Sequence, residues 1–136
     1  MLKIFIIFST LWAGLWAEPL KLSQLDGTWH MRVLDGMEVR KARAILDFNA
    51  KKMHLSGFDA CNRIEATLIQ NLHTINTNTI KSTKMACRKP IHTWVSKRLQ
   101  ETLKEGFSIQ EVEKYGVEGL EIKSVKHTLF FKRMGN

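Results

Sequence analysis

The sequence predicts an α+β fold that is mainly β, with about eight antiparallel strands in a curled sheet or incomplete barrel and one amphipathic helix. Most of the chain consists of short segments in which apolar and polar residues alternate, as in half-buried strands. One segment, 91–105, instead repeats apolar residues every four positions. A sheet of this size must curl, close, or cover its apolar face with the helix.

The first 17 residues have the layout of a secretory signal peptide, because Lys3 precedes an apolar run that extends to Ala17. The run is too short to cross a bilayer. Cleavage after Ala17 leaves residues 18–136 as a single domain. We therefore expect a soluble chain in the periplasm or outside the cell, and a retained signal anchor is the alternative.

The first half of the domain is predicted to form strands joined by tight turns. In the strand 28–33, Trp29, Met31 and Val33 alternate with polar residues, and Asp35-Gly36 then turns the chain. The other strands expected in this half are 42–48, 53–57, 64–68 and a Thr-rich segment 75–85, in which 76–78 is a candidate turn.

The second half begins with the predicted helix, for which Pro90 marks the start and Gly106 the end. Ile91, Val95 and Leu99 share its apolar stripe. Three short apolar runs, 107–112, 120–123 and 128–132, are expected to be the last strands.

The mature chain is basic, since removing Lys3 reduces the 21 Lys and Arg to 20, against 13 Asp and Glu, a net charge of +7. Such a surface attracts anionic lipid head groups or lipopolysaccharide phosphates. The basic residues are dispersed and accompany no recognition motif, so nucleic acid is not an expected partner. A basic solvated surface without a specific partner is the simpler interpretation.

No arrangement of residues indicates an enzyme, a metal site or a cofactor. Cys61 with His54 and Asp59 has the residue types of a nucleophilic site, but proximity in sequence supplies neither a lowered pKa nor access. The five histidines, at positions 30, 54, 73, 92 and 127, have no recognised ligand spacing.

The only two cysteines, Cys61 and Cys87, form an even pair in a chain expected to be exported, which predicts a disulfide. Two reduced, buried thiols in neighbouring strands are the alternative.

Large apolar side chains from several segments have two interpretations: they line a cavity for an acyl chain, or they fill the core. The candidates are Trp29, Phe48, Met53, Trp94, Leu99 and Phe131. A basic rim for an anionic head group would consist of Arg40, Lys41, Arg43, Arg88 and Lys89. A solvated charged edge that guards a strand is the commoner explanation for such basic residues.

Several motifs resemble the META domain family, the HslJ-like bacterial envelope proteins. The Leu, Gly and Trp pattern at the N-terminus includes Gly27 and Trp29, and the Gly-spaced Gly-Cys-Asn motif corresponds to Gly57 and the segment 60–62, which ends in Asn62. The Thr-rich run that ends in Met-Ala-Cys includes Met85 and Ala86. Ala60 replaces the Gly that usually precedes the Cys, and Thr93 replaces an acidic residue.

The segment Gly27-Thr28-Trp29 also resembles the opening of lipocalins, in which a late basic residue, here Lys132 or Arg133, covers the Trp. In lipocalins the helix follows eight strands, whereas here it precedes the last three.

The META resemblance implies a non-enzymatic envelope protein that binds an apolar or lipidic ligand or acts in envelope stress. The alternative is a protein-interaction module, such as a secretion pilot or an inhibitor of an extracellular enzyme.

Overall fold

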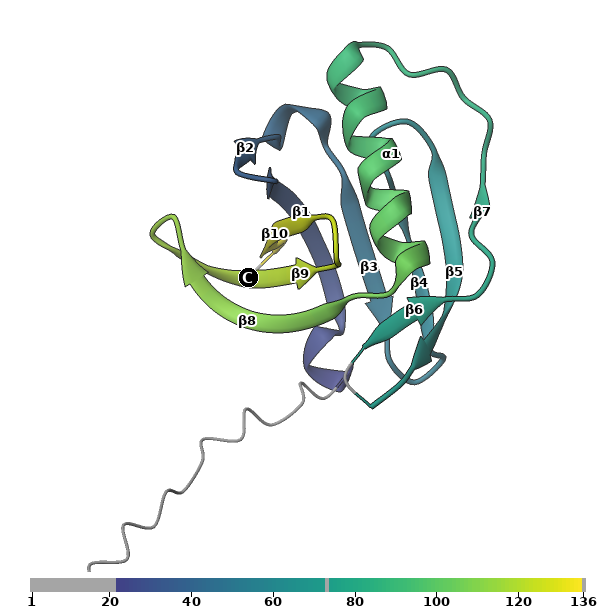
Figure 1. Cartoon of the computed structure of the whole chain (residues 1–136), viewed down its shortest axis with the longest axis vertical. Coiled ribbons are helices and arrows are strands. Elements are labelled where there is room, and N and C mark those ends of the chain that lie inside the picture. The colour runs from purple at the N-terminus through teal and green to yellow at the C-terminus, as the bar shows by residue number, and fades with distance from the viewer. Residues whose placement is uncertain (1–21, 73, 136) are drawn as a thin grey trace, which may run out of the picture.

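The computed structural model describes residues 22–72 and 74–135, so the predicted signal peptide, 1–17, lies outside the described residues. The fold is a curled antiparallel sheet that forms a half-barrel, with one helix packed against it (Figure 1). The predicted fold class is confirmed.

Eight strands run across the sheet in the order β6-β5-β4-β3-β1-β10-β9-β8, and every pairing is antiparallel. Their bounds are β1 (Gly27–Leu34), β3 (Ile45–Asn49), β4 (His54–Phe58), β5 (Arg63–Gln70), β6 (Ile75–Thr77), β8 (Ser108–Lys114), β9 (Val117–Lys123) and β10 (Thr128–Arg133). Two short strands, β2 (Met37–Glu38) and β7 (Lys81–Ser82), pair with β1 and β5.

The two ends of this strand order meet at one point. The backbone groups of Ile75 and Phe107 exchange two hydrogen bonds of 2.7 Å, immediately before β8 begins. Figure 1 shows β6 and the start of β8 side by side beneath the helix. The half-barrel is therefore joined at this end, and the helix occupies the opening above it.

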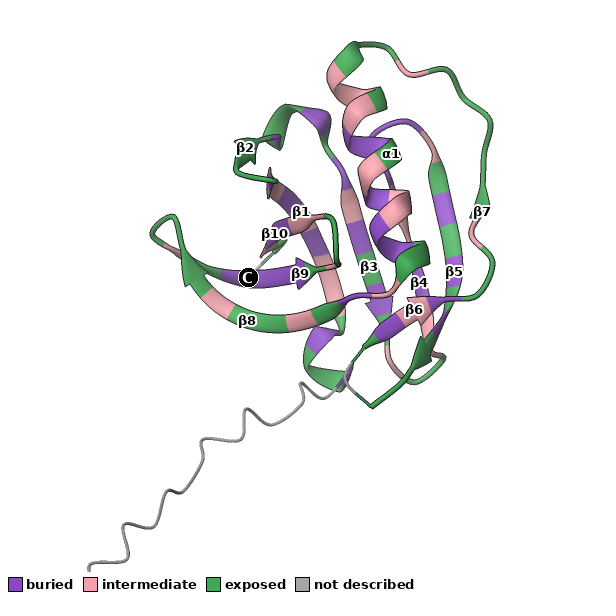
Figure 2. Ribbon diagram, viewed as in Figure 1, coloured by how far each residue is buried: buried purple, intermediate pink, exposed green. Residues whose placement is uncertain are grey.

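The helix α1 (Pro90–Glu105) lays its apolar stripe on the concave face of the sheet. Val95, Leu99 and Leu103 are fully buried in one continuous core with residues from most of the strands. Figure 2 shows buried segments facing the helix and exposed segments along β8. Among the described residues, no helix combines the length and apolar character needed to span a membrane.

Two predicted strands differ in detail. The strand expected over 42–48 begins only at Ile45, because a 3-10 helix, η2 (Arg40–Ala42), precedes it and Arg43 adopts a left-handed conformation with φ of 59°. The segment expected as one strand over 75–85 is divided into β6 and β7. With the short strand β2, which was not predicted, the sheet has ten strands where about eight were expected.

Candidate functional site

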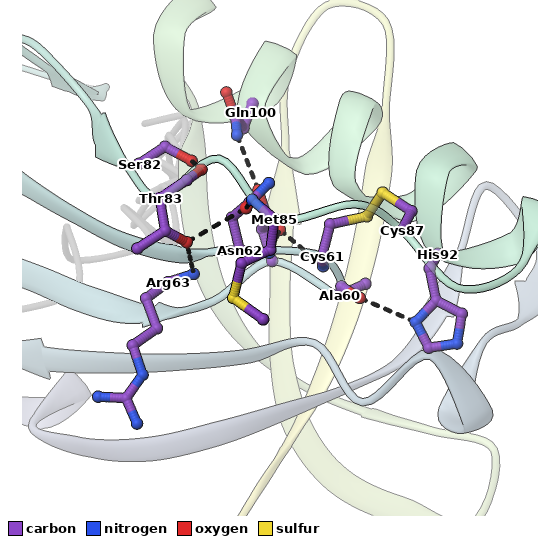
Figure 3. The surroundings of a disulfide bond; sticks show 11 residues. Ala60, Cys61, Asn62, Arg63, Ser82, Thr83, Met85, Cys87, His92 and Gln100 are labelled. Carbon is purple, nitrogen blue, oxygen red and sulfur yellow. Dashed lines mark hydrogen bonds between the residues drawn. A yellow bond between two sulfur atoms is a disulfide. The ribbon is translucent and has the colours of Figure 1, made fainter.

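The two cysteine segments lie against each other, joined by the predicted disulfide between Cys61 and Cys87, whose Cα atoms are 4.9 Å apart (Figure 3). The side-chain oxygen of Asn62 accepts hydrogen bonds from the Met85 backbone N–H, at 2.5 Å, and from the Thr83 hydroxyl, at 3.1 Å. The family-motif residue Asn62 therefore holds the second cysteine segment beside the first.

Asp59 organises this loop, a role that was not expected from the sequence. Its carboxylate is fully buried, and Oδ1 accepts the backbone N–H groups of Cys61 (2.9 Å) and Asn62 (2.7 Å). Its Oδ2 accepts a hydrogen bond from Gln100 of α1 at 2.7 Å. An Asp at the start of a turn is a sequence signal for the contacts with the backbone. The contact with Gln100 has no such local signal, because the two residues are 41 positions apart.

The Ala60 backbone has φ of 89°, a conformation that glycine adopts more easily, so the Gly that the family resemblance predicts at this position would fit the turn with less strain. Its carbonyl oxygen lies 2.8 Å from Nδ1 of His92. At Gly57 a Cβ atom would overlap the carbonyl oxygen of Ile45 on the neighbouring strand, so only glycine fits. Of the other motif residues, Gly27 begins β1, Trp29 is buried, and Met85 and Ala86 are exposed.

The six residues considered for an interior cavity lie in or against the hydrophobic core. Trp29, Phe48, Leu99 and Phe131 belong to the buried cluster, and Met53 and Trp94 pack on it. Of the six, Trp29 alone lines any of the three hollows described below. These three hollows are lined mainly by other residues.

A cleft with an aromatic floor opens on the outer face of the sheet, opposite the helix, and we call it the Phe130 cleft. Its volume is about 410 Å³. Phe130 is only 3% exposed, although it does not belong to the main core cluster. The lining residues are Arg32, Val33, Gly36, Glu38, Arg40, Tyr115, Val117, Phe130 and Lys132.

The tip of the β8–β9 hairpin forms one wall of the Phe130 cleft. Tyr115 at this tip packs edge-on against Phe130, with ring centroids 5.3 Å apart, and is 65% exposed. Lys114 beside it forms an ion pair with the buried Glu121 across the hairpin, and Lys123 lies 3.5 Å from the same carboxylate. These ion pairs fix the strands that carry Tyr115.

The Phe130 cleft is basic. Three of its side chains are cationic and one is anionic, a net of +2. Glu38 pairs with Arg40 at 3.4 Å, whereas no ion pair of Arg32 or Lys132 occurs in the described part of the chain. The Nε of Arg32 is also buried without a hydrogen-bond partner among residues 22–72 and 74–135. Two cations thus remain available to an anion.

An irregularity in β1 directs Arg32 toward this cleft. Met31 pairs with Phe131 and Val33 with Phe130, so Arg32 is the extra residue of a β-bulge. A bulge redirects a side chain and occurs frequently beside functional sites. Alternation in the sequence alone did not indicate it.

The predicted basic rim is divided by the structure. Arg40 lines the Phe130 cleft, while Lys41 and Arg43 are exposed on and after η2. Arg88 and Lys89 lie just before α1, and η2 contacts this helix. Sequence reasoning missed Arg32 and Lys132 as partners of Arg40 because these three residues come from different elements.

Two further hollows differ in character. A groove of about 880 Å³ crosses the outer face of β1, β3, β4, β5 and β7, where Ile45, Phe58 and Met85 lie among polar side chains. The other, of about 440 Å³, contains Trp29 and Arg133 with Glu111, Glu113 and Glu118. We call the first the outer groove.

The structure does not assemble the nucleophilic arrangement considered from the sequence. Cys61 is in a disulfide, Asp59 is engaged by backbone N–H groups and Gln100, and His54 lies on β4 opposite Asn49 and Thr67. Within residues 22–72 and 74–135, no three His, Cys, Asp or Glu side chains gather as a metal ion would require. His73 lies outside the described residues.

The half-barrel, the helix across its opening and the disulfide between the two motif loops define a small β-rich domain of a known type. The META domain model matches residues 20–134. The chain belongs to the META domain family.

Solved structures agree with this assignment at the level of the fold. The NMR structure of a protein from Burkholderia xenovorans is 20% identical, with 88% of this chain and 92% of that chain covered and a TM-score of 0.63. A second protein structure determined by NMR is 21% identical, with 84% and 95% covered and a TM-score of 0.68. No curated protein matches the chain.

Proposed function

We propose that this META domain protein is a non-enzymatic binding protein of the bacterial envelope that holds an amphiphile with an anionic head in the Phe130 cleft. The observation that carries the proposal is the combination of a buried aromatic floor with two cations, Arg32 and Lys132, that form no ion pair within the described residues. The apolar part of the ligand would lie on Phe130, and the head would meet the basic side chains.

The dimensions and the charge of the cleft support this ligand class. A volume of about 410 Å³ lies within the range of small-molecule sites. The net charge of +2 favours an anion, and the exposed Tyr115 at the hairpin tip offers a ligand further aromatic surface. The ligand proposed from the sequence is therefore retained, but its place moves from the interior of the sheet to its outer face.

Export is part of the proposal and rests on the cysteine chemistry. Disulfides persist in oxidising compartments such as the periplasm or the extracellular space. The disulfide between Cys61 and Cys87 and the signal-like first 17 residues both support export. A role in envelope stress rests on the family resemblance.

A binding titration of the oxidised protein with octyl sulfate, which combines a short tail with an anionic head, tests the ligand class. Octyl glucoside supplies the tail without the charge, and sulfate supplies the charge without the tail. Of the three compounds, only octyl sulfate is expected to bind saturably, and its binding should change NMR shifts around Phe130 and Val33. Equal binding of octyl glucoside, or no binding of octyl sulfate, would overturn the proposal.

Substitutions locate the site. Lys132→Gln and Arg32→Gln each remove one cation from the Phe130 cleft, and we expect each to weaken octyl sulfate binding by about three- to tenfold. Arg88→Gln is the matched control, because Arg88 is a basic residue outside this cleft. Equal weakening by all three changes would indicate attraction by net charge and not a site.

The second candidate function is a protein-interaction module, and the outer groove is the observation in its favour. Met85 in this groove is 60% exposed, and Ile45 and Phe58 add apolar surface to it. A partner protein that binds there would perturb the NMR signals of these residues and leave those of Phe130 unchanged.

A further inference from the structure

His30 lies beside the Phe130 cleft on the same face of the sheet. Its neighbours along β1, Trp29 and Met31, are buried in the core, so the side chain of His30 points to the outer face. In the ladder it lies directly opposite Lys132, which lines the cleft. Directly paired residues of an antiparallel ladder point to the same face.

Charged side chains face His30 from four elements. Arg32 follows it on β1, Lys132 lies opposite on β10, and Arg40 and Glu38 come from η2 and β2. Partial burial lowers the pKa of His30, and Arg32 and Arg40 lower it further, while Glu38 opposes them. The free protein therefore disfavours a proton on His30.

We infer that His30 couples ligand binding to proton uptake, so that the protein binds an anionic amphiphile more tightly as the pH falls. The inference rests on the proposed function of the Phe130 cleft. Burial is the largest cause of the lowered pKa of His30, and an anionic head in the Phe130 cleft would offset the second cause, the charges of Arg32 and Arg40. Protonated His30 would add a further cation next to the ligand. Because linkage is reciprocal, a ligand that favours protonation binds better to the protonated protein.

The site would thus select its ligand by charge and release it as the pH rises. Binding strengthens as the pH falls through the pKa of His30 in the complex, and the gain is complete below the pKa of the free protein. We expect an affinity gain of about fivefold, the effect of one more unit charge a few ångströms from the ligand in a largely aqueous setting.

Octyl sulfate is the appropriate probe, because its head group does not titrate in the range of histidine. The NMR titration curve of His30 is recorded without the probe and with saturating octyl sulfate, and the affinity is measured at about pH 5 and about pH 8. An upward shift of the His30 pKa, with tighter binding at the lower pH, is expected. A His30 pKa that does not move would overturn the inference.

Two variants isolate the contribution of His30. His30→Gln is expected to bind octyl sulfate equally at both pH values. His127→Gln is the matched control, since His127 does not line the Phe130 cleft, and it should retain the pH dependence. If octyl sulfate does not bind at any pH, the proposed function itself fails; if it binds in the Phe130 cleft equally at both pH values, only the coupling fails.

Discussion

Arg133 lies over the ring of Trp29, with its Cζ atom 4.3 Å from the ring centroid. The guanidinium also donates hydrogen bonds to the carbonyl oxygens of Asp26 (2.6 Å) and Gln24 (3.1 Å), and the Trp29 indole N–H donates to Leu25 at 2.8 Å. The late basic residue expected to cover the Trp in a lipocalin-like chain is therefore present in this META domain. It ties the last strand to the segment that precedes the first.

Replacement of Arg133 by Gln should lower the free energy of unfolding by about 1–2 kcal/mol, because it removes the cation over Trp29 and at least one of the backbone hydrogen bonds. Urea unfolding followed by circular dichroism measures the change. Lys132→Gln, which changes the preceding residue, is the matched control and should lower the free energy of unfolding by less than about 0.5 kcal/mol. Equal losses in both variants would contradict a specific role for Arg133.

Removal of the disulfide should lower stability by about 3.5 kcal/mol, the chain-entropy value for a separation of 26 residues. The variant that carries both Cys61→Ala and Cys87→Ala should unfold at a lower urea concentration than the oxidised protein. Adding a reductant should destabilise the wild-type protein and leave this variant unchanged. A reductant-insensitive wild-type protein would indicate that the thiols are not joined.

Asp59→Ala should destabilise the protein by about 2–4 kcal/mol, because it leaves the N–H groups of Cys61 and Asn62 without this acceptor. Asp47→Ala, on the exposed surface of β3, is the control and should change stability by less than about 0.5 kcal/mol. Gln100→Ala tests the link to the helix and should cost less than Asp59→Ala. Comparable stability of the two aspartate variants would refute this role of Asp59.

His127 connects three parts of the fold. Its Nδ1 lies 2.8 Å from Asp35 in the β1–β2 turn, and its Nε2 lies 3.0 Å from Glu101 of α1. Partial burial lowers the pKa of His127, but hydrogen bonds to Glu101 and Asp35 outweigh it, so the pKa is raised overall. The hydrogen bond to His127 in turn lowers the pKa of Glu101, and the positive charges of Lys97 and Lys126 lower this pKa further.

The stability that His127 provides should be lost as the pH rises. Its pKa in the folded protein exceeds the unfolded value of 6.5, so its contribution is complete below that value and disappears as the pH passes the folded pKa. The stability difference between the wild-type protein and His127→Gln should therefore be larger at about pH 6 than at about pH 9.

Urea unfolding of both proteins at the two pH values gives this comparison. The Glu101→Gln variant removes one carboxylate partner and should show a smaller pH dependence than the wild-type protein. A difference between wild type and His127→Gln that is constant with pH would show that His127 contributes through packing alone.

Local patterns in the sequence determined most of the secondary structure, the helix and the family. The alternation at Trp29 and Met31, the four-residue spacing from Ile91 to Leu103 and the turn at Asp35-Gly36 appear in the structure where they were expected. The prediction that Val33 shares the face of Trp29 was wrong, because the bulge at Arg32 turns Val33 to the outer face and buries Leu34 in its place. Each depends on residues close together in the chain. The pairing of Cys61 with Cys87 was predictable for a different reason, since no other cysteine is available.

Only the tertiary structure decided which distant residues meet. The Phe130 cleft joins Arg32 to Lys132, which are far apart in the sequence but lie near each other because β1 pairs with β10. The bulge at Arg32 and the closing bridge between Ile75 and Phe107 likewise depend on strand register and on the curl of the whole sheet. Periodicity reports the face on which a residue lies, but not its neighbours across strands. The sequence therefore indicated an interior cavity or a filled core, and it could not indicate the outer cleft in which we propose that the ligand binds.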